Sequence, residues 1–305
     1  MKAAVIGLGS MGLGAALSLA RAGIGVAGCD LRPEPLARLT AAGGRAAADP
    51  ADAARDADVV FVYVVSAAQT AQVLFGPGGA AGAAAPGTVF VLCATVEPAD
   101  AEALCARLAD AGMAVIDAPV SGGATRAEAG EISMMAAGDP AAFERIAPAL
   151  GAISAKVFRL GDEPGAGSRM KLINQLLAGV HIAAMGEAMA LAGRMGMDLA
   201  EVHRVIQDCA GNSWMFANRG EHVVAGDYAP RSAVDIFVKD LGIVTGAAGA
   251  MGACVPLSQT ALEMFRDASA AGMGRRDDAA VALLLARRAG VVLPGDDTGN
   301  DADGG

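Results

Sequence analysis

Aromatic residues are scarce in this sequence: Phe, Tyr and Trp make up 4% of its 305 residues, and Trp214 is the single tryptophan. Apolar residues nevertheless account for 54% of the chain, much of it alanine, and 41 residues are glycine. We therefore expect helices that pack closely on small side chains. Because a chain of 305 residues exceeds what one hydrophobic core usually fills, we also expect two domains.

Positive charge is also in short supply. Lys and Arg total 23 against 33 Asp and Glu, which gives a formal net charge of -10. Proteins that bind nucleic acids or anionic membranes present basic surfaces, so neither partner is expected here. An anionic ligand must then be held by local cations and backbone N–H groups, since the overall field repels it.

Cysteine pairs and long apolar runs are absent as well. The five cysteines are odd in number, scattered and never spaced CxxC, so neither a disulfide framework nor a zinc site is expected, and a reducing cytoplasm fits best. The longest strongly apolar run, residues 59–65, is too short to span a membrane. Glycines at positions 7, 9, 12 and 14 would break the apolar helix of a secretory signal. We therefore predict a cytoplasmic location.

The first half of the chain alternates short β-rich segments with helical ones. Predicted strands are residues 3–8, 25–30, 58–65, 88–93 and 114–117, and predicted helices are 11–22, 34–42, 67–75 and 98–111. A strand–helix–strand set at 132–136, 140–150 and 156–159 follows. Since the strands are apolar without strict alternation, both sheet faces should be covered, as in a parallel sheet. The pattern predicts an α/β Rossmann domain with a mostly parallel sheet.

The pattern changes after a turn-rich junction, Gly-Asp-Glu-Pro-Gly-Ala-Gly at 161–167. Predicted helices beyond it are residues 168–195, 199–210, 232–250, 255–271 and 277–288. We expect a Rossmann NAD-binding domain over 1–162 and an all-α C-terminal domain over 163–290, used for substrate binding and dimerisation. The tail over 291–305 is rich in Asp and poor in large apolar residues, which predicts disorder.

A nucleotide-binding motif lies between the first strand and the first helix. The segment reads Gly7-Leu8-Gly9-Ser10-Met11-Gly12, the GxGxxG pattern. Its glycines allow a tight turn, close approach of the backbone to a pyrophosphate, and close packing of helix on strand. Asp30 ends the second strand, where a carboxylate binds a ribose 2′-OH and repels a 2′-phosphate. Arg32 would offset that repulsion only in part, so NAD is favoured over NADP.

Three further segments carry residues suited to chemistry. Residues 117–123 read Asp-Ala-Pro-Val-Ser-Gly-Gly directly after a strand, where N–H groups and the Ser121 hydroxyl would bind an anion. Residues 165–174 carry the pattern Gly-x-Gly-x-x-x-Lys-x-x-Asn, which places Lys171 and Asn174 at i and i+3 on one helix face. Residues 238–241, Val-Lys-Asp-Leu, place Lys239 within an apolar helix.

The four motifs, in this order and spacing, resemble those of the β-hydroxyacid dehydrogenases, relatives of 6-phosphogluconate dehydrogenase, from Lys2 to about residue 285. The resemblance implies two domains with a cleft between them and a homodimer or homotetramer formed through the helical domain. It implies that Lys171 is the catalytic acid/base and that Asn174 contacts the reacting hydroxyl. Thr95 and Lys239 would touch NAD. Implied ligands of the substrate carboxylate are Ser121, Gly122 and Gly123, with Lys171 and Asn174 completing the substrate site.

In the stretches 175–182, 210–216 and 230–241, the second half of the chain is similar to the branch of that family that oxidises L-threonate to 2-oxo-tetronate. Gln175 stands where many family members have a second Asn, and Asn174 stands where that branch is expected to have His. The same site would serve reduction of tartronate semialdehyde or oxidation of 3-hydroxyisobutyrate. An imine reductase or a non-catalytic nucleotide-binding module would typically lack the lysine, and Lys171 argues against both.

The chemistry is consistent with these residues. Oxidation of a secondary alcohol needs a hydride acceptor and a group that takes the hydroxyl proton, and a lysine does so when its neutral amine is favoured. Lys239 and the positive nicotinamide would both favour the neutral amine of Lys171. No metal is expected, because no His, Asp and Glu cluster has ligand spacing. Trp214 and Phe216 fit a core or a cleft wall equally well.

Overall fold

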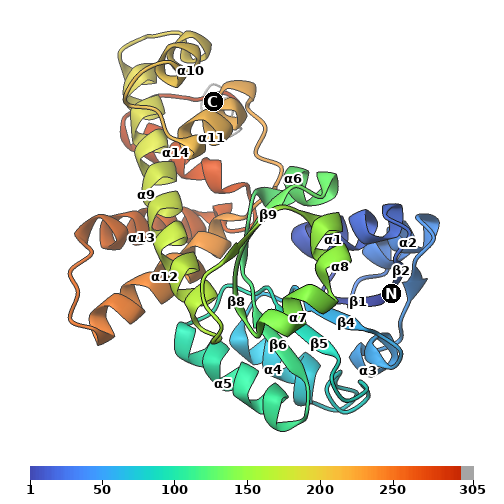
Figure 1. Ribbon diagram of the computed structural model, residues 1–305. Coiled ribbons are helices and arrows are strands. Elements are labelled where there is room, and N and C mark those ends of the chain that lie inside the picture. Colours follow the sequence, from blue (N-terminus) through green and yellow to red (C-terminus); the bar gives the residue numbers. More distant parts are fainter. Residues whose placement is uncertain (297–305) are drawn as a thin grey trace. The chain divides into compact units, whose positions relative to one another are not determined.

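The computed structural model describes residues 1–296 (Figure 1). The chain divides into two compact units, one over Met1–Lys171 and the other from Leu172 onward. The division falls inside the long helix α9 (Ala166–Arg194), whereas the sequence predicts a boundary near residue 162, at the turns before this helix.

The first unit is built on a nine-stranded sheet in the order β3-β2-β1-β4-β5-β6-β8-β7, with β9 beside β8. The strands are β1 (Lys2–Ile6), β2 (Gly25–Cys29), β3 (Arg45–Ala46), β4 (Val59–Val62), β5 (Val89–Leu92), β6 (Ala114–Asp117), β7 (Val120–Ser121), β8 (Ile132–Gly138) and β9 (Ser154–Arg159). Strands β1 to β6 pair in parallel, and β8 runs antiparallel to both β6 and β7. This confirms the mostly parallel sheet, with the strand order of a Rossmann fold.

Helices cover both faces of this sheet (Figure 1). One face packs against α1 (Ser10–Arg21), α2 (Pro33–Ala41), α6 (Gly123–Ala129), α7 (Pro140–Arg145) and α8 (Ala147–Ile153). The other packs against α3 (Pro50–Ala54), α4 (Ala67–Phe75) and α5 (Pro98–Asp110). Successive strand residues alternate between the two cores: Val5 and Phe61 lie in the first, Ile6 and Val62 in the second. Because neither strand face is exposed, both can be apolar.

The helix predicted over 140–150 is instead two helices, α7 and α8. Ile146 ends α7 with φ −108° and ψ 12°, outside the helical range. Pro148 follows in the first turn of α8, where its missing N–H costs no helical hydrogen bond, whereas it would interrupt a continuous helix. The short elements β3, β7, α3 and α6 were not predicted, because two to seven residues give too little periodicity.

The described elements of the second unit are helical, as predicted. They are α9 from Leu172 on, α10 (Leu199–Gln207), α11 (Trp214–Ala225), α12 (Val234–Ala250), α13 (Pro256–Ala268), a π-helical turn η1 (Ser269–Met273), a 3₁₀ turn η2 (Asp278–Ala280) and α14 (Val281–Arg288). Phe237 and Phe265 stack in their core with ring centroids 5.2 Å apart. By length and composition α9 is the one described helix able to cross a membrane, but half of its most apolar stretch is buried, as in a core helix.

Helix α11 was missed by the sequence prediction. It begins at Ser213, whose hydroxyl accepts a hydrogen bond from the Phe216 N–H at 3.0 Å. This helix contains Trp214 and Phe216, which the sequence could place either in a core or on a cleft wall, and the structure places them differently. Phe216 is 5% exposed and belongs to the core, whereas Trp214 is 52% exposed.

The beginning of the predicted tail is packed against the second unit. Leu293 is buried in the helical core, and Asp296 forms an ion pair with Arg287 at 2.6 Å. The predicted disorder begins at residue 291, whereas the structure describes residues 291–296 in contact with this core. Val291 also packs against it, and Arg276 donates to the Gly295 oxygen at 3.1 Å. Residues 297–305 lie outside the described part of the chain.

Candidate active site

The glycine loop between β1 and α1 leaves the start of α1 open. Gly7 has a φ of +87°, and a Cβ on Gly12 would lie 1.9 Å from the Gly7 oxygen, so both positions require glycine. Gly9 is the N-cap of α1, no side chain caps the helix, and its first turn holds no acidic residue. A Cβ on Gly9 would meet nothing within 4 Å. The N–H groups of this first turn and the space beside Gly9 fit a pyrophosphate.

Asp30 follows β2 and is fixed beside this loop. Its Oδ2 accepts from the Leu8 N–H at 2.7 Å and its Oδ1 from the Arg32 N–H at 2.9 Å, with Arg32 Nε 3.1 Å away. Burial alone would raise the pKa of this carboxyl, but hydrogen bonds from Arg32 and Leu8 and the charge of Arg32 lower it. The ionised carboxylate keeps lone pairs for a ribose hydroxyl, so the residues present fit a dinucleotide.

The start of α9 is closed, in contrast, by the carboxylate of Asp117 at the end of β6. Asp117 Oδ2 accepts from the N–H groups of Gly165 at 2.9 Å and Ser168 at 2.8 Å, and Oδ1 accepts from the Ser168 hydroxyl at 2.7 Å. Burial raises the pKa of Asp117, and these hydrogen bonds oppose the rise. Three donors on one acid match its ionised form, which the positive end of the helix also favours.

The glycines of the Gly-x-Gly-x-x-x-Lys pattern have a geometric cause. Gly165 has a φ of +100°, and a Cβ there would meet the Glu102 carboxyl. A Cβ on Gly167 would lie 2.4 Å from the Met135 oxygen and 2.6 Å from the Asp117 oxygen. The first turn of α9 therefore lies directly against the end of β6 and the middle of β8, which sets the place of the lysine that follows.

Lys171 is 7% exposed, and its Nζ donates to the Val120 oxygen at 2.8 Å. That oxygen belongs to the peptide that joins Val120 to Ser121, and β7 is fixed by pairing with β8. Gly122 and Gly123 follow with φ values of +138° and +75°. The structure thus brings Lys171 together with the predicted carboxylate ligands. Thr95 lies partly buried three residues beyond β5, where that strand leaves the sheet.

Two predicted residues of the second unit are joined by a chain of polar contacts. Asn174 Nδ2 donates to Gln175 Oε1 at 2.9 Å, and Gln175 Nε2 donates to Asp240 Oδ2. Lys239 Nζ lies 2.7 Å from Asp240 Oδ1. Sequence reasoning did not assign Gln175 or Asp240 to the site. The adjacent amide and acid in two site motifs were the signals that could have found them.

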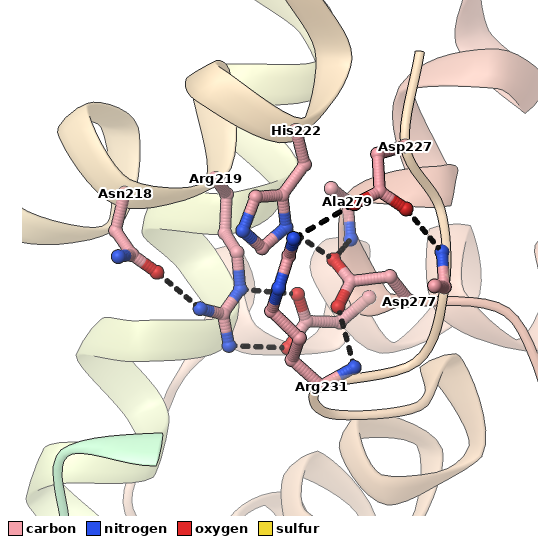
Figure 2. A network of polar contacts seen from close by, with 9 residues as sticks. Asn218, Arg219, His222, Asp227, Arg231, Asp277 and Ala279 are labelled. Atoms are coloured by element: carbon pink, nitrogen blue, oxygen red, sulfur yellow. Dashed lines mark hydrogen bonds and ion pairs between the residues drawn. The ribbon is translucent and has the colours of Figure 1, made fainter. Parts of the chain in front are cut away.

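A second polar network in this unit was also missed (Figure 2). Arg219 of α11 forms a two-pronged ion pair with Asp278, at 2.6 and 3.0 Å, and His222 Nδ1 lies 2.8 Å from Asp277 Oδ1. Burial would raise the pKa of Asp277, but the His222 contact and the Arg219 charge lower it. All four side chains are at least nine-tenths buried, which suits a structural role. The partners lie too far apart in sequence for any local pattern to reveal them.

A doubly wound parallel sheet, an open glycine-turn helix start and a buried lysine beside a Ser-Gly-Gly turn define a nucleotide-binding dehydrogenase. The family model of the NAD-binding domain of 6-phosphogluconate dehydrogenase matches residues 2–161. The model described as the NAD-binding domain of NADP-dependent 3-hydroxyisobutyrate dehydrogenase matches residues 165–290. The chain belongs to this β-hydroxyacid dehydrogenase family, and it is an NAD-binding hydroxyacid dehydrogenase.

Individual relatives agree with this assignment. The chain is 54% identical over 291 residues to an L-threonate dehydrogenase of Cupriavidus necator, covering 95% of this chain and 97% of the relative. It is 51% identical over 292 residues to that of Escherichia coli K12, covering 95% and 96%. A solved structure from Salmonella typhimurium, described as a 3-hydroxyisobutyrate dehydrogenase, matches with a TM-score of 0.89 and 50% identity, covering 93% and 99%.

Proposed function

We propose that the protein oxidises L-threonate to 2-oxo-tetronate with NAD, and that Lys171 is the acid/base. The observation that carries the proposal is the 2.8 Å hydrogen bond from Lys171 Nζ to the Val120 oxygen. It holds a buried amine within one residue of Ser121, in a segment able to bind a carboxylate. The L-threonate dehydrogenases at 51–54% identity support this substrate over other small hydroxy acids.

Each proposed residue has a separate task. The Ser121 hydroxyl and the N–H groups of Gly122 and Gly123 bind the substrate carboxylate, which fixes the neighbouring carbon. Asn174 contacts the hydroxyl on that carbon, and the neutral amine of Lys171 takes its proton. The chemistry that bound NAD would supply is a hydride acceptor for the C–H bond of that carbon. In reverse, the Lys171 ammonium returns the proton to the developing alkoxide.

The proposed cofactor contacts come from the glycine loop, from Asp30 and from two residues that the family resemblance implies. The loop Gly7-Leu8-Gly9-Ser10-Met11-Gly12 would hold the pyrophosphate, and Asp30 the adenosine ribose. Thr95 and Lys239 would contact the remainder of the dinucleotide, as in the family. The fixed, ionised carboxylate of Asp30 supports NAD over NADP, because a 2′-phosphate would meet like charge.

A substrate panel tests the proposal. Hydroxy acids of three to five carbons, including both enantiomers of threonate, are offered with NAD or NADP while NADH or NADPH absorbance is followed. We expect the highest kcat/KM for L-threonate with NAD. Preference for 3-hydroxyisobutyrate, or for reduction of tartronate semialdehyde, would reject the substrate while keeping the reaction class.

A homodimer or homotetramer through the helical unit is also proposed. Three exposed apolar residues of α9 lie within about 40° of one another around the helix axis; they are Ile173, Leu177 and Leu191. Such a stripe along one helix supports contact with a second copy of the chain. Sedimentation at micromolar concentration should give at least twice the mass of one chain, and a monomer would contradict it.

The functional domains and the location are proposed in the same way. We assign residues 1–162 to NAD binding and 163–290 to substrate binding and association, which the turns before α9 support. The free thiols of Cys29, Cys93, Cys105, Cys209 and Cys254 support a reducing compartment such as the cytoplasm. A fluorescently tagged chain confined to the cytoplasm would agree with this location, and export would contradict it.

A further inference from the structure

We propose that Gln175 and Asp240 are positioning residues that fix the orientation of the Asn174 amide. The inference rests on the proposed function only in taking Asn174 as a substrate contact. It concerns three side chains of the second unit, which come from two helices. Asn174 and Gln175 lie on α9, and Asp240 lies on α12.

The direction of the hydrogen bonds from Asn174 through Gln175 follows from the acid at their end, Asp240. Asp240 is 2% exposed, and an ionised carboxylate only accepts hydrogen bonds, so Gln175 must turn its NH₂ group toward it. The oxygen of Gln175 then faces Asn174 and can only accept, so Asn174 must offer its N–H at 2.9 Å. Asn174 Oδ1 therefore lies on the far side of its amide from Gln175, as an acceptor for a hydroxyl or ammonium donor.

Lys239 is the cation paired with this acid. Its ammonium lies 2.7 Å from Asp240 Oδ1 and is itself partly exposed. The residue proposed to contact the cofactor thus also contacts the acid at the end of these hydrogen bonds.

The packing of the two helices explains why the contact forms. Gly179 lies one turn beyond Gln175 on α9, and a Cβ there would lie 2.8 Å from Leu241 Cδ1 on α12. The absence of that Cβ lets α9 and α12 approach closely beside Asp240. A glutamine side chain then reaches from α9 to the acid while its oxygen stays beside Asn174.

A double-mutant cycle on kcat tests whether the two residues act through one chain. Gln175→Met keeps the length of the side chain and removes both hydrogen bonds, and Asp240→Asn lets the glutamine turn either way. We expect each to lower kcat about tenfold, with the double variant no slower than the slower single one. Asp235→Asn, an exposed acid on the same helix α12, is the matched control and should leave kcat unchanged. Multiplying effects in the double variant would overturn the proposal.

A pH-dependent rescue gives a readout that a merely structural role would not produce. In Gln175→Glu, a protonated carboxyl can donate to Asp240 and accept from Asn174, as the glutamine does. When ionised it faces the Asp240 carboxylate, with the Lys239 ammonium as the nearby cation. The ratio of variant to wild-type kcat should therefore rise as pH falls from about 8 to 5. A flat ratio would overturn the proposal.

Side-chain amide resonances separate this inference from the proposed function. In ¹H–¹⁵N spectra of the whole protein, Asp240→Asn should shift the NH₂ signals of both Gln175 and Asn174, whereas Asp235→Asn should shift neither. A shift confined to the Gln175 signal would contradict the proposal that Asp240 orients Asn174 through Gln175, whatever the substrate proves to be. Activity on another hydroxy acid only, with both signals shifted, would reject L-threonate and keep the chain.

Discussion

Helices α1 and α9 begin in the same unit, each after a glycine turn. They differ in whether a carboxylate side chain caps their first turn. The start of α1 has no side-chain cap and no acidic residue. The start of α9 is filled by Asp117, which accepts three hydrogen bonds there. Both helix ends carry the same positive potential.

The difference shows how one kind of helix end can serve two purposes. An open end can hold an anion that comes and goes, such as a pyrophosphate. A closed end has its anion built in, so it fixes the helix and, within two turns, the amine of Lys171. The first end suits binding and the second suits positioning, and substitutions should separate the two effects.

The largest expected effect is at the closed end. Lys171→Ala should lower kcat on the order of 10²–10⁴, the usual contribution of a positioned acid/base. Lys171→Arg should not restore turnover, because a guanidinium stays protonated. NAD binding, measured by fluorescence titration, should change little, since the open end of α1 is untouched. Near-normal turnover in Lys171→Ala would remove the acid/base assignment.

At the open end, Gly9→Ala should weaken NAD binding without harming the fold. The added methyl meets no atom of the protein within 4 Å and φ is −67°, so Tm should stay the same. It would occupy space that we assign to the pyrophosphate, so Kd for NAD should rise about tenfold, or about 1.4 kcal/mol. Gly167→Ala is the contrasting control, with a lower Tm because its Cβ collides with backbone oxygens. An unchanged Kd for NAD in Gly9→Ala would show that the pyrophosphate does not bind beside Gly9.

A smaller effect concerns which dinucleotide the open end accepts. The unmodified enzyme should prefer NAD to NADP by about tenfold in kcat/KM, roughly 1.4 kcal/mol, because Asp30 repels a 2′-phosphate. Asp30→Asn removes that charge and leaves Arg32 in place, so it should reduce the preference for NAD over NADP. Equal use of both cofactors by the unmodified enzyme would contradict the role of Asp30.

The smallest expected effect concerns pH, which should leave the preference for NAD over NADP unchanged. Hydrogen bonds and Arg32 lower the pKa of Asp30 from its ordinary value despite burial, so the carboxylate gains a proton only at a lower pH than an ordinary aspartate does. The kcat/KM ratio of NAD to NADP should therefore stay constant from about pH 5 to 8. A ratio that falls within this window as pH drops would show that Asp30 protonates there.

Much of the fold could be predicted from local pattern alone. The helix predicted over 67–75 coincides with α4, because Ser66 caps its start and Gly76 ends it. The strand predicted over 114–117 is β6. The prediction failed at the short helix α6 and at the α7–α8 pair, where tertiary packing rather than periodicity decides the ends. It also missed the longer helix α11 (Trp214–Ala225).

The candidate site divides along the same line. Contacts close in sequence, such as the glycine loop of α1, could be predicted because the motif contains its own geometry. The cap of α9 joins Asp117 to Ser168, and the amide chain joins Gln175 to Asp240. Such partners are paired only by folding, so their residues are visible in the sequence while their connection is not.

The buried ion network of the second unit has a consequence for how that unit comes apart. Arg219 and His222 belong to α11, Asp277 directly precedes η2, and Asp278 is the first residue of η2. Figure 2 shows Arg219, His222 and Asp277 in this network. If either segment detached alone, it would leave unpaired charge in an apolar interior, at several kcal/mol. Detaching α11 alone, or the segment of Asp277 and Asp278 alone, is therefore less favourable than detaching both together. Two stretches separated by more than fifty residues of chain are thus made into a single cooperative piece, which melts all at once or not at all.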